Sequence, residues 1–184
     1  MALNSYLSLT GKKQGLIKGS VTQKGREGKI MVIAATHGVN SPRDAATGQS
    51  SGVRRHSPFV ITKELDASSP HLYTALAGNE VLSAWELQFW AASGTTNGAE
   101  VMRYTVRLVN ATVSDIRFHM PNNKNPELVR YAEYEEVAFT YERIEWTWVL
   151  GGLKASDGWA STQAAAAKGK PAAKLGARAA RTKS

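Results

Sequence analysis

The sequence predicts a mainly β fold: a closed antiparallel β-barrel with one short flanking α-helix and a long extended loop. Apolar and polar residues alternate in most segments up to Gly151, which is the pattern of half-buried strands. Short clusters of turn-forming residues separate these segments and predict hairpins. The long segments 100–120 and 134–150 each shift the phase of this alternation once, as bulged strands do when a sheet bends and closes.

Length and composition are those of a single globular domain. Of the 184 residues, 42% are hydrophobic, enough to form a substantial core. The absence of cysteine excludes disulfides and thiolate metal sites. The first residues lack the pattern of a signal peptide, and no apolar run approaches the roughly 18 residues of a membrane span. We therefore expect a chain made in the cytoplasm, without membrane insertion, whose export would not depend on a signal peptide.

Positive charge is concentrated at the C-terminus. Six of the 23 lysine and arginine residues lie in 162–184, which contains no acidic residue. The remaining 17 basic and 15 acidic residues leave the rest of the chain with a net charge of only +2. We divide the chain into a β-barrel body, residues 1–160, and a basic Ala/Lys-rich tail, residues 161–184. Glycine and proline interrupt every helical run in the tail, so we expect it to be disordered.

The first part of the body predicts three strands, at 6–10, 16–22 and 30–35, with turns at 11–13 and 25–28. Apolar residues alternate with polar ones in the first two strands. The third is apolar on both faces, so we expect it to be covered on both sides.

A polar loop from Asn40 to Pro58 follows, much longer than the usual connection of about 4 to 6 residues. A strand at 59–65 comes next. A short helix then begins with Ser69 as N-cap and Pro70 in its first turn, and Gly78 should end it. This is the one helix that we expect in the body.

Beyond the helix, we expect a strand at 82–91, a hairpin turn at 95–98 and a loop at 121–126. The two long segments should be interrupted near 110–111 and near 142–143, where their phases shift. The body then contains about eight or nine strands, and its hairpin connections favour a barrel over a βαβ fold.

One catalytic pattern occurs by letter. Residues 48–52 match the G-x-S-x-G nucleophile elbow, with Ser50 as the candidate nucleophile. The elbow needs a strand before the serine and a helix after it, and neither is predicted. We therefore interpret this segment as loop, and a hydrolase that uses Ser50 remains a minor alternative.

Histidines and carboxylates do not predict a metal site. No pair of histidines has metal-ligand spacing, although two of them could meet in the fold. Glu133, Glu135 and Glu136 precede a strand and are interpreted as a solvated edge. We expect no metal, no cofactor and no enzymatic activity. The four histidines are His37, His56, His71 and His119.

Two features could bind nucleic acid. Trp146, Trp148 and Trp159 could stack on bases, but alternate positions of a strand are more often core or interface. The basic tail could bind phosphates, and its simpler interpretation is a solubilising extension. A nucleic-acid-binding module acting through the tail is the alternative function, and nucleic acid is not the partner that we expect for the body.

Several short segments, taken in order over about residues 3–160, resemble the Hcp (haemolysin-coregulated protein) family, the tube proteins of bacterial type VI secretion. The resemblance rests on 37–39 (HGV), 41–42 (SP), 47–48 (TG), 55–58 (RHSP), 61–66 (ITKELD), 69–72 (SPHL), 144–148 (IEWTW), 151–152 (GG) and Trp159.

This resemblance implies a closed β-barrel whose hexameric rings stack into a hollow tube. The tube would assemble in the cytoplasm inside a contractile sheath, carry a spike protein at its tip, and be expelled with small effector proteins, some of them in its lumen. The extended loop of the family reaches neighbouring subunits, so the resemblance assigns subunit and ring contacts to this loop. The assigned residues are Asn40, Arg43, Asp44, Thr47, Gly48, Gly52, Arg54, Arg55 and His56.

Overall fold

A computed structural model describes residues 5–93 and 100–159 of the chain. The hairpin turn expected at 95–98 and the whole basic tail lie outside the described residues, and the division of the chain at residue 160 stays a prediction. Within the described part, no helix is long and apolar enough to cross a membrane.

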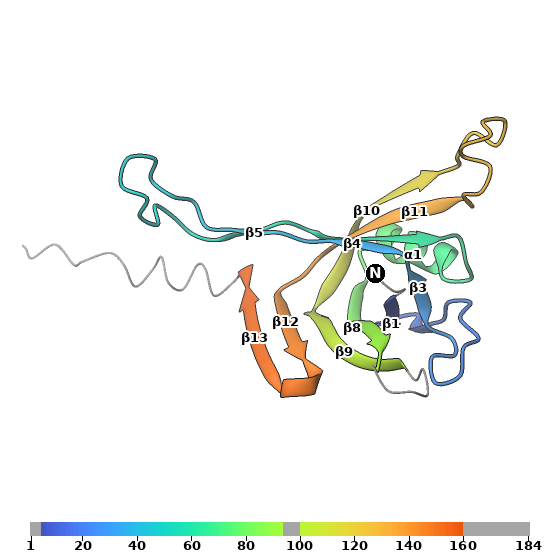
Figure 1. Cartoon of the computed structure of the whole chain (residues 1–184), viewed down its shortest axis with the longest axis horizontal. Coiled ribbons are helices and arrows are strands. Elements are labelled where there is room, and N and C mark those ends of the chain that lie inside the picture. The colour runs from blue at the N-terminus through green and yellow to red at the C-terminus, as the bar shows by residue number, and fades with distance from the viewer. Residues whose placement is uncertain (1–4, 94–99, 160–184) are drawn as a thin grey trace, which may run out of the picture.

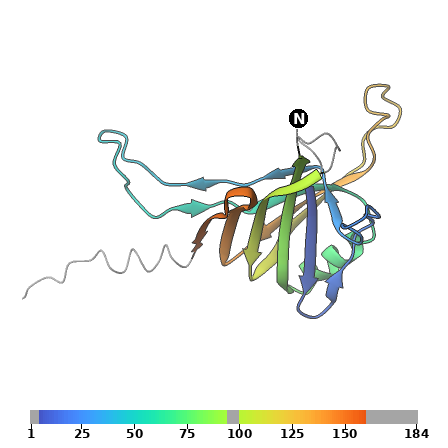
Figure 2. The same ribbon diagram turned by 60° about the horizontal axis from the view of Figure 1, so that its bottom comes forward.

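The described body is mainly β with one helix. Eleven strands form one strongly curled antiparallel sheet, a half-barrel (Figures 1 and 2). Along the sheet the order is β13-β12-β9-β8-β10-β11-β7-β4, and β1 pairs with β8, β2 and β3. The strands are β1 Ser5–Gly11, β2 Gly15–Ile17, β3 Ile30–Val32, β4 Ala34–Thr36, β7 Phe59–Glu64, β8 Val81–Ala92, β9 Glu100–Val109, β10 Ala111–His119, β11 Tyr134–Thr140, β12 Arg143–Trp148 and β13 Leu153–Gly158.

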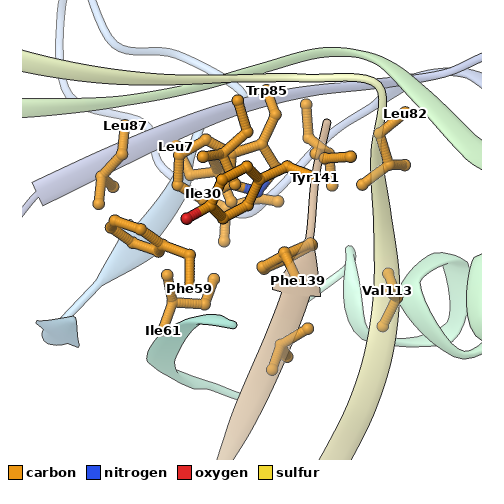
Figure 3. Packing of buried hydrophobic residues seen from close by; sticks show 14 of the residues in the cluster. Leu7, Ile30, Phe59, Ile61, Leu82, Trp85, Leu87, Val113, Phe139 and Tyr141 are labelled. Atoms are coloured by element: carbon orange, nitrogen blue, oxygen red, sulfur yellow. The ribbon is translucent and has the colours of Figure 1, made fainter. Parts of the chain in front are cut away.

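The curled sheet encloses an apolar core (Figure 3). Three aromatic rings form its centre: Trp85 meets Phe59 and Phe139 edge-on, with ring centres 5.0 and 5.5 Å apart. Leu7 and Leu9 of β1 are fully buried, as their alternation with polar residues predicts. Each such side chain stabilises the fold by roughly 1.5 to 3 kcal/mol through burial.

Both expected strand interruptions are confirmed. Asn110 separates β9 from β10 and has a φ of +50°, a left-handed conformation that asparagine tolerates better than most residues. Residues 141–142 separate β11 from β12. These breaks allow two long, nearly continuous segments to follow the curvature of the sheet.

Two strand predictions are wrong in part, one strand is unpredicted, and the total number of strands is higher than expected. The strand expected at 16–22 ends at Ile17. The strand expected at 30–35 is interrupted at Ile33, and β4 is exposed, so it is not covered on both sides. Strand β13 was not expected, because its sequence LKASDG shows no apolar alternation; it forms by pairing with β12. The described strands, thirteen with two in a separate ribbon, also outnumber the eight or nine expected.

Helix α1 (Ser69–Ala77) lies beside the sheet and ends at Gly78, as predicted. Leu72 and Ala75 are its buried apolar residues. The N-cap is Ser68, one residue before the prediction. The hydroxyl of Ser69 instead donates to Glu135 of β11, at 2.8 Å. A tertiary contact therefore replaces the local cap.

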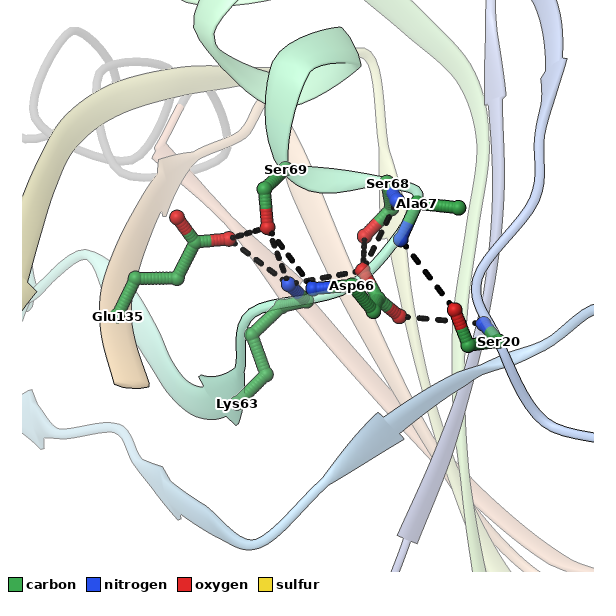
Figure 4. A network of polar contacts seen from close by, with 7 residues as sticks. All are labelled: Ser20, Lys63, Asp66, Ala67, Ser68, Ser69 and Glu135. Carbon is green, nitrogen blue, oxygen red and sulfur yellow. Dashed lines mark hydrogen bonds and ion pairs between the residues drawn. The ribbon is translucent and has the colours of Figure 1, made fainter. Parts of the chain in front are cut away.

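A buried ionic network corrects the expectation for Glu135. This residue lies opposite Lys63 of β7 in the sheet, and neither side chain is exposed to solvent. The Lys63 Nζ donates to Glu135 Oε1 at 2.8 Å and lies 3.0 Å from Asp66 Oδ1 (Figure 4). Glu135 is thus no solvated edge, because the cross-strand lysine compensates its charge. The network joins β7, β11 and the start of α1.

Candidate functional site

The long polar loop folds into a projecting hairpin. Residues 38–57, called the arm from here on, leave the sheet between β4 and β7 and extend away from the body (Figures 1 and 2). Strands β5 (Val39–Asn40) and β6 (Arg55–His56) form a separate two-stranded antiparallel ribbon. Every residue from 43 to 55 is exposed.

The tip of the arm is a hydrogen-bonded turn. Asp44 Oδ1 accepts hydrogen bonds from the backbone N–H of Ala46 at 3.0 Å and of Thr47 at 2.8 Å, and from the Thr47 hydroxyl at 3.0 Å. These bonds, led by the one from the Thr47 backbone, lower the pKa of Asp44. Gly48 has a φ of +68°, a conformation that L side chains rarely adopt. Asp44, Thr47 and Gly48 therefore define the shape of the tip.

The G-x-S-x-G segment lies in this hairpin. Ser50 forms an isolated bridge with Arg43, and its Oγ lies 3.3 Å from Ser41 Oγ. Exposed hairpin precedes Ser50 and β6 follows it, so the strand-to-helix turn of a nucleophile elbow is missing.

Arg54 joins the arm to the outermost strand of the sheet. Its guanidinium binds Asp157 of β13 in a bidentate manner, with Nε–Oδ2 and Nη2–Oδ1 distances both of 2.8 Å. This pairing raises the pKa of Arg54. The fork-to-carboxylate geometry restricts the direction in which the arm leaves the sheet.

A group of five residues, called the base cluster, holds the point where the arm begins and ends. The Tyr141 hydroxyl lies 2.6 Å from His37 Nε2 and 3.0 Å from His56 Nδ1. His56 Nε2 lies 3.3 Å from Asp157 Oδ2, and the Trp159 ring stacks on His56. The cluster thus connects the arm to the β11–β12 junction and to β13.

Burial is the main cause of the pKa shifts of Tyr141 and His37 in the base cluster. It raises the pKa of Tyr141 to about 12, so the hydroxyl keeps its proton at neutral pH. Burial, with a smaller contribution from the charge of His56, lowers the pKa of His37. Both groups are therefore neutral hydrogen-bonding partners near pH 7.

The residues assigned to subunit contacts occupy three parts of the arm. Asn40 and Arg55 pair in the ribbon, and Gly52 lies on the returning side. Arg54 and His56 meet through Asp157. The tip holds the rest, namely Arg43, Asp44, Thr47 and Gly48. Their role in subunit contacts stays a prediction.

Sequence reasoning missed the body side of the base cluster. Tyr141 and Asp157 each lie more than 80 residues from their arm partners in the chain. The sequence allows two of the histidines to meet in the fold, and His37 and His56 do so, with ring centres 6.3 Å apart. Within the described ranges, no group of three or more histidine, cysteine, aspartate or glutamate side chains could hold a metal ion.

Two exposed apolar areas lie away from the arm. The first, called the groove, has a volume of about 820 Å³ beside the β10–β11 loop. The second, called the turn patch, lies where β12 turns into β13 through the 3₁₀ turn η1 (Val149–Gly151). Exposed apolar residues of the groove are Ile33, Phe118, Met120 and Tyr131, and those of the turn patch are Trp148, Val149, Leu150 and Leu153.

Comparison with known proteins places the chain in a family. Residues 6–148 match the family described as "Type VI secretion system effector, Hcp". The chain is 39% identical over 170 residues to the "Major exported protein" of Pseudomonas aeruginosa, covering 88% of this chain and 98% of that protein.

Solved Hcp structures share the fold. A crystal structure of an Hcp protein has a TM-score of 0.78 and 30% identity, covering 85% of this chain and 97% of that one. A mutant form of the Hcp1 protein of Escherichia coli EAEC 042 has a TM-score of 0.74 and 35% identity, covering 86% and 99%. The chain therefore belongs to the Hcp family of the type VI secretion system, a family of secreted structural tube proteins and not of enzymes.

Proposed function

We propose that this chain is a tube protein of the type VI secretion system, which assembles into stacked hexameric rings and is expelled to deliver effectors. The observation that carries the proposal is the arm. The hydrogen bonds and ion pairs that join it to the body, described above, all lie at its base. An isolated two-stranded hairpin is at best marginally stable in water. A neighbouring subunit would supply the missing support along the exposed residues 43–55.

The two apolar areas support a ring in the same way. The groove involves β7, β10, β11, the loop between β10 and β11, and Ile33. The turn patch lies on β12, η1 and β13 at the other end of the sheet order. Exposed apolar areas of this kind often mark protein interaction sites. Two different areas on one chain suit head-to-tail contacts, which generate rings or filaments.

Closure of the barrel belongs to the same proposal. β3 pairs with β1 and β4 pairs with β7, and only Ile33 separates β3 from β4. The Ile33 N–H donates to the Thr62 carbonyl at 2.9 Å, which continues the ladder across this break. A barrel closed in this way leaves few free strand edges, which suits a protein that must assemble in one manner only.

Membership of the family extends the proposal to the partners. The rings would stack in the cytoplasm inside a contractile sheath, with a spike protein at the tip and small effectors in the lumen. Export of the tube would then depend on the secretion machine and not on a signal peptide.

The proposal is tested by light scattering and negative-stain microscopy of the purified protein. We expect a mass of about six chains and open rings, which stack at high concentration. In a matched variant, residues 43–50 are replaced by Asn-Gly, because the Ser51 N–H already donates to the Pro42 carbonyl at 3.0 Å and a two-residue turn fits there. This variant should melt like the wild type and fail to form stacked rings.

Two outcomes would contradict the proposal. If the wild-type protein stays monomeric at every concentration, the chain does not form a tube. If the shortened variant still forms rings and stacks like the wild type, the arm does not contribute to the assembly contacts.

A further inference from the structure

The base cluster is built around a single hydroxyl that serves two histidines. His37 connects β4 to the arm, and His56 lies at the end of the arm, before β7. Both rings lie within hydrogen-bond distance of the Tyr141 oxygen, at 2.6 and 3.0 Å. We propose that Tyr141 is the positioning residue of the arm, and that protonation of His37 in mild acid releases the arm from the body.

A tyrosine hydroxyl has one proton, so it can donate to only one of the two rings. With its proton on Nε2, His56 faces Asp157 with an N–H and turns its bare Nδ1 toward Tyr141. Tyr141 then donates to His56 Nδ1 and accepts from the Nε2–H of His37. The two neutral rings and the hydroxyl thus satisfy one another, while His56 Nε2 lies 3.3 Å from Asp157 Oδ2 without a hydrogen bond.

The cluster can accept one further proton. When it binds to His56 Nδ1, that N–H donates to the Tyr141 oxygen, and the hydroxyl turns to donate to His37 Nε2. For this, His37 changes to the tautomer with its proton on Nδ1. The positive charge on His56 lies beside the Asp157 carboxylate, 3.3 Å away. The arm stays in place in this state.

A second proton, on His37, cannot be accepted by a similar rearrangement of the hydrogen bonds. Both imidazolium rings would then donate to an oxygen that already has a hydrogen bond with the Trp159 side chain, so three donors would compete for two lone pairs, and the Tyr141 hydroxyl would lose its acceptor. The two charged rings would lie 6.3 Å apart between centres. Only Asp157 carries a negative charge within the base cluster, and Arg54 already binds both of its oxygens.

Among the described residues, those that line the recess around His37 do not offer a counter-charge. Phe59 stacks on its ring, Trp146 lies beside it, and Arg103 and Tyr104 of β9 line the same recess. These neighbours include no carboxylate, and the one charged side chain among them, Arg103, has the same sign as a protonated His37. A protonated His37 is therefore more stable in water than in the recess, in agreement with its lowered pKa. Because His37 connects β4 to β5, its departure changes the direction of the arm.

The inference rests on the proposed function for its biological meaning: acid would loosen the contacts that the arm makes between subunits. The motion itself does not depend on assembly. It can be measured within one chain, so the two proposals can fail separately.

The test uses the whole 184-residue chain, which contains no cysteine. Spin labels are attached at Ala45→Cys in the tip and Lys12→Cys in the β1–β2 turn, both exposed positions. Labelled chains are diluted with unlabelled ones, and the distance between labels is measured by double electron–electron resonance. We expect a narrow distribution at about pH 7.5 and one about twofold wider at about pH 5.

Two variants test whether His37 and the Tyr141 hydroxyl cause the acid-induced broadening of the distance distribution. His37→Gln keeps an N–H donor toward Tyr141 but cannot be protonated, so its distribution should stay narrow in acid. Tyr141→Phe removes the shared hydroxyl, so its distribution should be wide at both pH values. Broadening of His37→Gln in acid to the wild-type extent, or a wild type that stays narrow in acid, would overturn the inference.

The oligomeric mass of the same samples separates the two proposals. If the protein forms rings but the distance distribution does not change in acid, the proposed function is supported and the acid release of the arm is contradicted. If the distribution broadens in acid but the protein forms no rings, the acid release is supported and the proposed function is contradicted.

Discussion

The curled sheet and the arm belong to one chain, but different contacts hold them. In the sheet, Trp85 and Phe139 are fully buried in a continuous apolar core. In the arm, every residue from 43 to 55 is exposed, and the base cluster with Arg54 supplies its connections to the body. Apolar burial does not depend on protonation, whereas ion pairs are screened by salt and contacts of titrating groups change with pH. The body should thus behave as a rigid scaffold and the arm as an adjustable part.

The largest effect on the difference between sheet and arm is expected when one of the buried charges in the body is removed, because this lowers the stability of the body itself. Glu135→Ala leaves the fully buried Lys63 without its nearest carboxylate, so we expect a loss of about 3 to 5 kcal/mol of unfolding free energy. Urea denaturation measures it. The paired variant Lys63→Met with Glu135→Leu removes both charges and should recover most of the loss. A Glu135→Ala variant as stable as the wild type would contradict the account of the network.

A pH titration of stability tests the base cluster. The pKa of His37 is lower in the folded chain than its ordinary value of 6.5, so below pH 6.5 the unfolded chain binds more protons than the folded one. Stability should therefore be full above pH 6.5, fall as the pH decreases below it, and level off below the folded pKa. Thermal melts at several pH values measure this. The decrease should be smaller in His37→Gln, and an identical curve would remove His37 as its source.

A smaller effect is expected in the tip. Gly48→Ala places a Cβ on a backbone with a φ of +68°, where no neighbour lies within 4 Å, so only backbone strain opposes it. The expected local cost is about 1 kcal/mol. Hydrogen exchange of residues 44–49 should become faster while the melting temperature of the body stays the same.

Gly52→Ala is the matched control for the tip. Its Cβ would meet Pro42 at an ordinary distance of 3.8 Å, and its backbone needs no left-handed conformation. Exchange as fast in Gly52→Ala as in Gly48→Ala would show that the conformation of Gly48 is not the cause.

The smallest effect is expected from Arg54→Ala. Its ion pair with Asp157 is half exposed on the arginine side, and such pairs contribute little to stability. The global unfolding free energy should hardly change, while trypsin should cleave after Arg55 faster than in the wild type. Added salt should reduce this difference, because it screens exposed pairs. Equal cleavage rates at low salt would mean that Arg54 does not hold the arm.

The local pattern of residues determined much of the body. The phase shifts near Asn110 and Glu142 predicted the breaks in the two long segments, and Gly78 predicted the end of α1. The length and polarity of the segment after Asn40 predicted that it lies outside the core. These signals are local, because alternation, caps and turns depend on residues a few positions apart.

Only the tertiary structure decided which polar residues meet. Glu135 looks like part of an acidic edge, and it is buried because Lys63, 72 residues away, lies opposite it in the sheet. Likewise, His37 and Tyr141 are 104 residues apart, and β13 exists only as a partner of β12. A local sequence pattern predicts whether a side chain can face the core. It does not predict which distant charged group or hydroxyl will pair with a buried polar side chain, because the pairing of strands determines those neighbours.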